Sequence, residues 1–243
     1  MKISEDKQPP QPRFEHQKYA RERKSYREML PLLLGLDFSA ADHIHHFPAF
    51  AGELTLARYL SLYEAYKMTS GLAGHIAEVG IGTGSATLLF AKLCRLFEPH
   101  SLTLVHGFDW FQGAAPTSEE KHIAPGECRT SEDLVRDLVR IQDLEGIVHI
   151  HNLEVTTQLK AFLDEQQHLL FKLVFLDCGI HDVVAASIEA LWPRLVPGGV
   201  LVLDHYSHEF APGEARAVRN LLPHAVFRQF PFGWMPTAYA VKE

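Results

Sequence analysis

From residue 74 onward the chain alternates short apolar runs with amphipathic stretches, and this alternation constrains the fold more than any other feature. The apolar runs have the length of strands, and the stretches between them carry apolar residues at helical spacing. Because parallel strands need a crossover connection, usually a helix, this order predicts a doubly wound, mostly parallel sheet. We expect strands over 75–79, 102–108, 148–153, 170–176 and 200–203, and helices over 86–97, 134–144, 157–167, 183–195 and 213–222.

Two further short runs, 225–230 and 237–241, close the chain with only a short link between them. A short link favours an antiparallel pair of strands. The predicted fold class is therefore α/β, with a Rossmann-like, mostly parallel, seven-stranded sheet that has an antiparallel edge strand.

The N-terminal part lacks strand candidates. Residues 1–17 are polar and rich in proline, and we expect a flexible tail there. Residues 18–72 are expected to form a helical cap, with helices over 18–36 and 53–70 and a connection rich in His and Phe over 43–50. Residues 73–243 then form the Rossmann-like domain, in which the polar stretch 112–132 is a long loop that is either a lid or a plain surface loop.

Composition excludes several classes of partner. The 243-residue chain carries 23 Lys and Arg against 30 Asp and Glu, which gives a formal net charge of −7 with neutral His. A nucleic-acid-binding chain usually shows a basic balance or stripe, so no nucleic acid is expected. No apolar run approaches the ~18 residues of a membrane span, so no membrane is expected. Three widely spaced cysteines and a polar N-terminus without an apolar signal segment predict a cytoplasmic protein with reduced thiols.

The most informative segment is 78–84 (EVGIGTG), which lies between a predicted strand and a predicted helix. Glycines let the backbone approach a ligand closely, and a helix N-terminus favours polar or anionic groups. An acid beside this loop repels a pyrophosphate and suits the sulfonium and ammonium of S-adenosylmethionine. Glu78, Gly80, Gly82 and Gly84 are therefore candidate cofactor-binding residues; the alternative is an ordinary tight turn.

Asp109 ends the second predicted strand, 25 residues after Gly84. In doubly wound nucleotide sites a carboxylate at this place accepts hydrogen bonds from ribose hydroxyls. The alternative for Asp109 is a residue that caps the loop. Trp110 follows it and is a candidate to pack near the adenine, with core packing as the alternative.

Acids also end the fourth and fifth predicted strands. Asp177 ends the fourth, and Asp204 with His205 ends the fifth. Ligands bind outside the carboxyl ends of parallel strands, and two carboxylates with an imidazole can hold a divalent cation there. Because successive strand residues point to opposite faces, both Asp204 and His205 can be ligands only where the strand has ended. Capping of the strand-end turns is the alternative.

With these residues, the chain resembles class I S-adenosylmethionine-dependent methyltransferases, and in particular the metal-dependent macrocin O-methyltransferase family, which methylates sugar hydroxyls of natural products. The resemblance covers roughly residues 43–243. Besides the glycine loop, it is carried by 46–50 (HFPAF), by 107–113 (GFDWFQG) and above all by 176–219. In the last stretch the family pattern L-D-G-D-L-Y-x-S, P-x-L-x-P-G-G, D-D-Y and G-x-x-x-A-V aligns without a gap.

The resemblance implies that Asp177, Asp204 and His205 are the metal ligands, but the third is a departure, because the family has an acid there. Imidazole is a poor ligand for Mg²⁺ and an acceptable one for Mn²⁺. The residue that the family uses as general base is Gly179 here, which cannot accept a proton. His181, two residues on, is the candidate base, with a plain helix-start residue as the alternative.

We expect S-adenosylmethionine-dependent methylation of a small polar acceptor, as O-methylation of a sugar or natural-product hydroxyl, with Asp177 and His181 as catalytic residues. A divalent metal, Mg²⁺ or Mn²⁺, is an optional participant, and the architecture suits a homodimer. Gly179 favours an alternative: a catalytically altered cofactor-binding protein or partner subunit that retains the cofactor pocket. A nicotinamide-dependent oxidoreductase fits less well, because Glu78 and Ser85 depart from its loop pattern.

Overall fold

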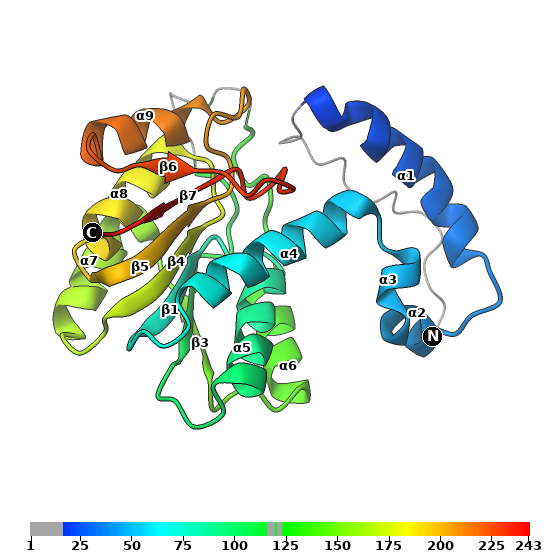
Figure 1. The fold of residues 1–243 in the computed structure, drawn as a ribbon, viewed down its shortest axis with the longest axis horizontal. Helices are drawn as coiled ribbons and strands as arrows, with labels where there is room; N and C mark the ends of the chain where they lie inside the picture. The colour runs from blue at the N-terminus through cyan, green and yellow to red at the C-terminus, as the bar shows by residue number, and fades with distance from the viewer. Residues whose placement is uncertain (1–16, 116–119, 121–122) are drawn as a thin grey trace.

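The structure is a computed structural model that describes residues 17–115, 120 and 123–243. A single seven-stranded sheet lies at its centre, with helices on both faces, and an N-terminal arm of helices extends to one side (Figure 1). Residues 1–16 of the tail expected over 1–17, and part of the loop expected over 112–132, fall outside the described residues. None of the described helices is long and apolar enough to span a bilayer.

The sheet has the strand order β3-β2-β1-β4-β5-β7-β6. The strands are β1 (His75–Val79), β2 (Val105–Asp109), β3 (Val148–Asn152), β4 (Phe171–Leu176), β5 (Leu195–Leu203), β6 (Phe227–Arg228) and β7 (Ala238–Val241). Strands β1 to β5 are parallel, and β7 pairs antiparallel with both β5 and β6. The predicted fold class is confirmed, and the reversed strand lies one position inside the edge. The strand order reverses between β1 and β4, which is where doubly wound sheets bind ligands.

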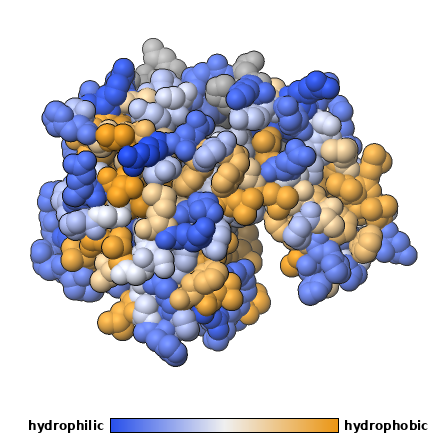
Figure 2. All heavy atoms as spheres, in the orientation of Figure 1, coloured by the Kyte–Doolittle hydropathy of each residue, from blue (hydrophilic) through white to orange (hydrophobic). Residues whose placement is uncertain are grey.

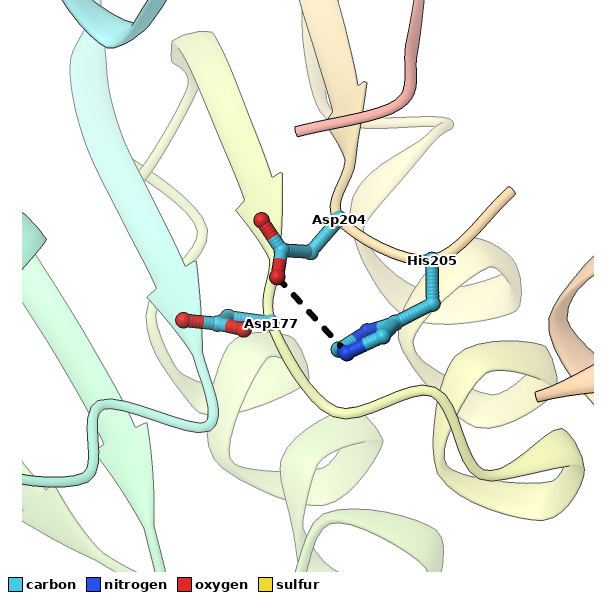
Figure 3. Close-up of side chains that lie close together, drawn as sticks. All are labelled: Asp177, Asp204 and His205. Atoms are coloured by element: carbon cyan, nitrogen blue, oxygen red, sulfur yellow. Dashed lines mark ion pairs between the residues drawn. The ribbon is translucent and has the colours of Figure 1, made fainter. Parts of the chain in front are cut away.

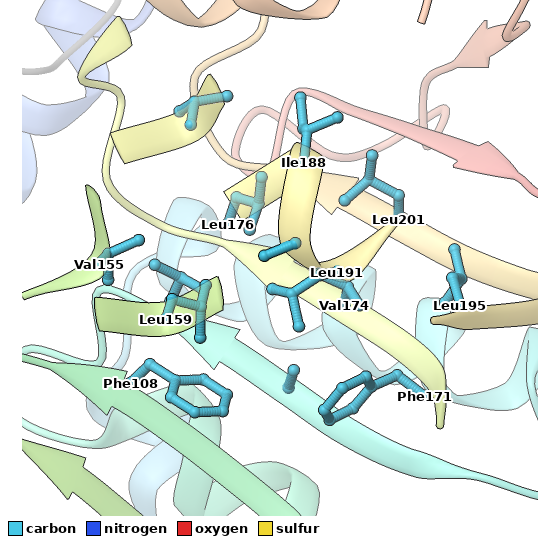
Figure 4. Packing of buried hydrophobic residues seen from close by; sticks show 14 of the residues in the cluster. Phe108, Val155, Leu159, Phe171, Val174, Leu176, Ile188, Leu191, Leu195 and Leu201 are labelled. Atoms are coloured by element: carbon cyan, nitrogen blue, oxygen red, sulfur yellow. The ribbon is translucent and has the colours of Figure 1, made fainter. Parts of the chain in front are cut away.

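Helices cover both faces of the sheet. One face carries α7 (Val155–Glu165), α8 (His181–Leu191) and α9 (Pro212–Leu221), and the other carries α4 (Glu53–Met68), α5 (Ser85–Phe97) and α6 (Glu132–Ile141). Two hydrophobic clusters fill the space between sheet and helices, one on each face. Figure 4 shows residues of the cluster that includes Leu159 of α7 and Ile188 of α8. All six residues of β4 are buried, as expected for a central strand with both faces covered. They include Lys172, whose ammonium pairs with Glu98 at 2.6 Å.

The largest differences from the predicted boundaries lie at the end of α8 and the start of β5. The helix expected over 183–195 ends at Leu191, and the strand expected from residue 200 begins at Leu195. Leu195 pairs with Phe171, and the ladder then skips to Leu173 and Val200 through a register shift. The intervening Pro-Gly-Gly segment has the composition of a turn, but β5 continues through it with an irregularity in its pairing with β4.

The N-terminal cap consists of a 3₁₀ turn (Gln17–Tyr19), α1 (Ala20–Leu34), α2 (Ala40–His45), α3 (Phe47–Phe50) and α4. The connection expected over 43–50 forms parts of α2 and all of α3 instead. Ser39 and Asp42 form a capping box that starts α2, a local signal that sequence reasoning passed over. Helix α4 packs on α5 through Leu62 and Tyr66, which are fully buried, whereas α1 has no buried residue.

Candidate active site

The glycine loop after β1 has the conformation that the sequence predicts. Gly80 has a φ of +83°, and a Cβ there would lie 2.4 Å from the carbonyl oxygen of Asp177. Only glycine allows this close approach of the β1 and β4 ends. Gly82 has a φ of +52°, and a Cβ there would meet nothing within 4 Å. The loop is therefore open on the side where a ligand would lie.

A cavity of about 360 Å³ lies over this loop, at the carboxyl ends of the strands. This volume is typical of small-molecule sites. Most of the predicted cofactor-binding residues line the cavity: Glu78, Gly80, Gly82, Asp109 and Trp110. Gly84 is not among the lining residues and serves as the N-cap of α5. Asp177 and His205 line the same cavity, so the predicted cofactor site and the acidic strand ends form one space.

Glu78 lies at the floor of the cavity and is 1% exposed. Its carboxylate accepts a hydrogen bond from the Thr87 hydroxyl. Burial, with the nearby charge of Asp177 as the next cause, raises the pKa of Glu78 well above its usual range. A cationic ligand beside this buried carboxyl would favour its charged form.

Asp109 fixes the backbone around the cavity. Its carboxylate accepts hydrogen bonds from the N–H of Gly82 at 3.2 Å and from the N–H of Phe111 at 2.8 Å. Asp109 therefore caps the loop, as its alternative interpretation predicted, and it also lines the cavity. The Trp110 indole donates to the carbonyl of Gly113 at 2.5 Å, which holds the ring at the cavity wall.

Glu154 is a cavity residue that sequence reasoning missed. It follows β3 and caps α7, accepting hydrogen bonds from the N–H groups of Thr156 and Thr157. The signal that could have found it is the one used for Asp109 and Asp177: an acid just past the end of a parallel strand.

The acidic strand ends come together as expected. β5 ends at Leu203, so Asp204 and His205 both lie past the strand and both approach Asp177 (Figure 3). Each of the three residues offers one ligand atom within 4.8 Å of the others. Asp204 Oδ2 lies 3.7 Å from His205 Nε2. The structure therefore brings together the three residues that the resemblance implies as metal ligands.

Arg58 is the residue of this cluster that sequence reasoning missed. It comes from α4 in the cap, and its guanidinium donates to Asp204 Oδ1 at 2.5 Å and to Asp177 Oδ2 at 2.7 Å. Burial opposes the charge of Arg58, but Asp204 and Asp177 outweigh it and raise the pKa above its ordinary value. The available signal was that Arg58 is the only charged residue between Glu53 and Glu64. A charge on such a helix face needs a partner when it is buried.

These contacts decide how well the residues fit a divalent metal. The donor set of two carboxylates and one imidazole is suitable by type. However, the guanidinium of Arg58 already bonds one oxygen of each carboxylate. A metal ion would need the negative charge of these two carboxylates and the space that the guanidinium occupies. The residues, as they are arranged, therefore do not fit a metal ion.

Gly179 and His205, the two residues that depart from the family pattern, lie next to each other. Gly179 has a φ of +62°, and a Cβ there would lie 3.2 Å from Nδ1 of His205. The imidazole thus lies beside the position where the family has its acid. Burial lowers the pKa of His205 to about 4, so the ring is neutral near pH 7. Glu214, which is fully buried and was not anticipated, accepts a hydrogen bond from the backbone N–H of His205 at 3.0 Å.

His181, the predicted base, begins α8. Its Nδ1 lies 2.8 Å from the exposed Asp182 carboxylate, and its backbone N–H donates to Glu120. His181 is not among the described residues that line the cavity. Its catalytic role stays a prediction.

A sheet with a topological switch at a glycine loop, and an acid-lined cavity above it, defines a class of Rossmann-like proteins that bind a nucleoside cofactor. Residues 77–206 match the family described as a methyltransferase domain. The chain belongs to this family, and it is a class I S-adenosylmethionine-dependent methyltransferase. A search of curated proteins by sequence finds no match.

Solved structures share the fold. The calicheamicin methyltransferase CalS11 superposes with a TM-score of 0.81 at 21% identity, over 97% of this chain and 98% of that one. A second structure of CalS11, described as a TDP-rhamnose 3′-O-methyltransferase, gives 0.74 at 24% identity over 91% and 94%. The O-methyltransferase NovP gives 0.65 at 16% identity over 77% and 80%. At these identities the likeness extends to the fold, cap included for CalS11.

Proposed function

We propose that this chain transfers the methyl group of S-adenosylmethionine to a hydroxyl oxygen of a sugar or another small natural product. One observation carries the proposal: Asp177 and His205 face the same cavity as the glycine loop. Cofactor and acceptor oxygen would therefore meet in one cavity, where much of the rate comes from holding them in line. The setting that this proposal implies is natural-product biosynthesis in the cytoplasm.

Each side chain has a part in this mechanism. Glu78 holds the cationic methionine half of the cofactor, and Asp109 holds the ribose. Asp177 takes the proton of the acceptor hydroxyl. Burial, with Asp204 as the next cause, raises the pKa of Asp177 to about 7 against the opposing effects of Arg58 and His205. A base with a pKa near the working pH is efficient in general base catalysis.

A second cavity, of about 370 Å³, supports a sugar acceptor that carries a larger group. Tyr206, which follows His205 in the chain, lines it and stacks on Phe227 with centroids 5.1 Å apart. Lys18 and Arg228 also line it, and the described lining includes no acid. Aromatic faces with cations suit an anionic, planar group such as a nucleoside diphosphate. The sugar named for CalS11, TDP-rhamnose, has this chemistry.

The test has two stages. Calorimetric titration of S-adenosylmethionine into the full-length protein should give micromolar affinity, and Glu78→Gln should weaken it by about tenfold or more. Formation of S-adenosylhomocysteine is then followed with nucleotide-linked sugars, free sugars, phenols and amines. Turnover is expected with hydroxyl acceptors and best with nucleotide-linked sugars. Binding without turnover of any hydroxyl acceptor would favour the cofactor-binding partner subunit, and turnover of amines alone would overturn O-methylation.

The proposal includes a homodimer built through the N-terminal arm. Large apolar side chains gather on α1 to α3 and the segment between them (Figure 2). Leu32 is 73% exposed and Ile44 is 79% exposed. The others are Met29, Leu34, Leu36, Phe38 and Phe47. A contiguous apolar surface of this kind is rare on a monomer, and a second copy of the arm is equally apolar and would cover it.

Light scattering checks the homodimer. The wild-type protein should have twice the mass of the chain, and the double variant Leu32→Ser, Ile44→Ser should shift it to the monomer. The matched control is Leu102→Ser, at an apolar residue that is 91% exposed and lies between α5 and β2, outside the arm. A monomeric wild-type protein, or a dimer that the double variant leaves intact, would contradict this interface.

A further inference from the structure

The side chain of Arg58 lies where the resemblance implies a metal ion. It bridges Asp177 and Asp204, which end two neighbouring strands, and both contacts are short. We infer that Arg58 is the resident cation of this site, and that it replaces the divalent metal and excludes it. The inference deepens the proposed function, but its main readout is metal binding and does not depend on finding an acceptor.

The geometry favours the guanidinium over a metal as the partner of these acids. A guanidinium is a planar fork whose separate N–H groups can bond two carboxylates at once. Here Nη1 bonds Asp204 and Nη2 bonds Asp177. A divalent cation would have to coordinate the same carboxylates and would be repelled by the fixed positive charge beside it. The two occupants therefore exclude each other.

Arg58 is also held in place by groups other than the two acids. Its guanidinium lies over the ring of Phe175, 5.6 Å from the centroid. The start of α4 is anchored because the Trp234 indole donates to the carbonyl of Leu54 at 2.7 Å. The Arg58 side chain is 23% exposed. A cation so fixed and so little exposed is a built part of the site, because moving it away would leave two acids without their partner.

The charge of the cluster agrees with this replacement. In the pattern that the chain resembles, three acids face a divalent ion, which leaves one net negative charge. In this chain His205 replaces the third acid, and the cation is a guanidinium. Counted by formal charge, two carboxylates facing one guanidinium also leave one net negative charge. The loss of one acid and the loss of one unit of positive charge therefore compensate each other.

The experiment is a titration of Mn²⁺ into the full-length protein, with free Mn²⁺ measured by electron paramagnetic resonance. Wild-type protein should bind Mn²⁺ no more tightly than about millimolar. Arg58→Ala frees the carboxylates and should bind it at least about tenfold more tightly. Arg58→Lys, which keeps the positive charge, should still exclude Mn²⁺. The double variant Arg58→Ala, Asp177→Asn should lose the gain, and Arg95→Ala, at an exposed arginine outside the site, should behave as wild type.

Micromolar Mn²⁺ binding by wild-type protein that Asp177→Asn abolishes would overturn the inference. So would the absence of any gain in Arg58→Ala, because the guanidinium would then not be what excludes the metal. Circular dichroism checks that each variant is folded, and Arg58→Gln, which retains hydrogen-bond donors without charge, replaces Arg58→Ala if the latter unfolds. Binding of S-adenosylmethionine, measured separately, shows whether the proposed function fails independently of this inference.

Discussion

Replacing Asp177 with asparagine should lower the turnover number by about three orders of magnitude, because asparagine cannot take the acceptor's proton. The affinity for S-adenosylmethionine should stay within about threefold, since Glu78 and Asp109, the residues proposed to hold the cofactor, remain. Single-turnover kinetics with an acceptor from the screen, together with cofactor titration, measure the two quantities.

The pH profile supplies a second readout for Asp177. A base must be deprotonated to act, so wild-type turnover should fall as the pH drops below about 7, the pKa to which burial and Asp204 raise this carboxyl. The asparagine variant should lose this dependence. Asp182→Asn, at an exposed acid of the same segment, is the control. A turnover number that stays within about tenfold of wild type in Asp177→Asn would show that another group takes the proton.

Acidification should destabilise the protein steeply because of a histidine cluster at the β3 edge of the sheet. His106 on β2 and His151 on β3 stack with centroids 5.3 Å apart, and His106 Nδ1 lies 3.0 Å from His151 Nε2. Burial lowers the pKa of both rings, and so does the charge of neighbouring histidines. His75 and His149 adjoin the pair, and Arg136 adds to the effect on His151.

The direction of this pH dependence follows from the lowered pKa of the two rings in the folded protein. Above about pH 6.5 both rings are neutral in the folded and the unfolded chain and contribute no pH dependence. Below that pH the two imidazoles bind protons in the unfolded chain but remain neutral in the folded chain. The free energy of unfolding then falls by up to about 1.4 kcal/mol per pH unit for each ring, until the folded-state pKa is reached. Two such rings give an expected loss of several kcal/mol, comparable with the stability of many domains.

Urea unfolding between pH 7.5 and 4.5 measures this dependence. The double variant His106→Phe, His151→Phe keeps the stacked arrangement without a titrating group and should flatten the curve over this range. His100→Asn, at an exposed histidine, is the matched control and should leave the slope unchanged. A double variant with the wild-type slope would show that other groups, such as the carboxylates, dominate acid unfolding.

The parts of the site that could be predicted from the sequence are those that local chemistry encodes. The acid before G-x-G-x-G, with Asp109 at the next strand end, predicted a ligand site at this edge of the sheet, and these residues except Gly84 line one cavity there. Asp177, Asp204 and His205 were expected at neighbouring strand ends, and their ligand atoms lie within 4.8 Å. Each of these predictions needs only the alternation of strands and helices and the rule that parallel strands end at the same edge.

The sequence by itself therefore determined the α/β sheet, the glycine loop and the edge at which the acids gather, because turn geometry and hydrophobic periodicity are properties of neighbouring residues. The tertiary structure alone decided what faces those acids. Arg58 is 119 residues from Asp177 and 146 from Asp204, and it reaches them only because α4 packs across the sheet. Packing also places Gly179 next to His205 and leaves His181 outside the described cavity lining. Such contacts between residues of different elements leave no local pattern in the sequence.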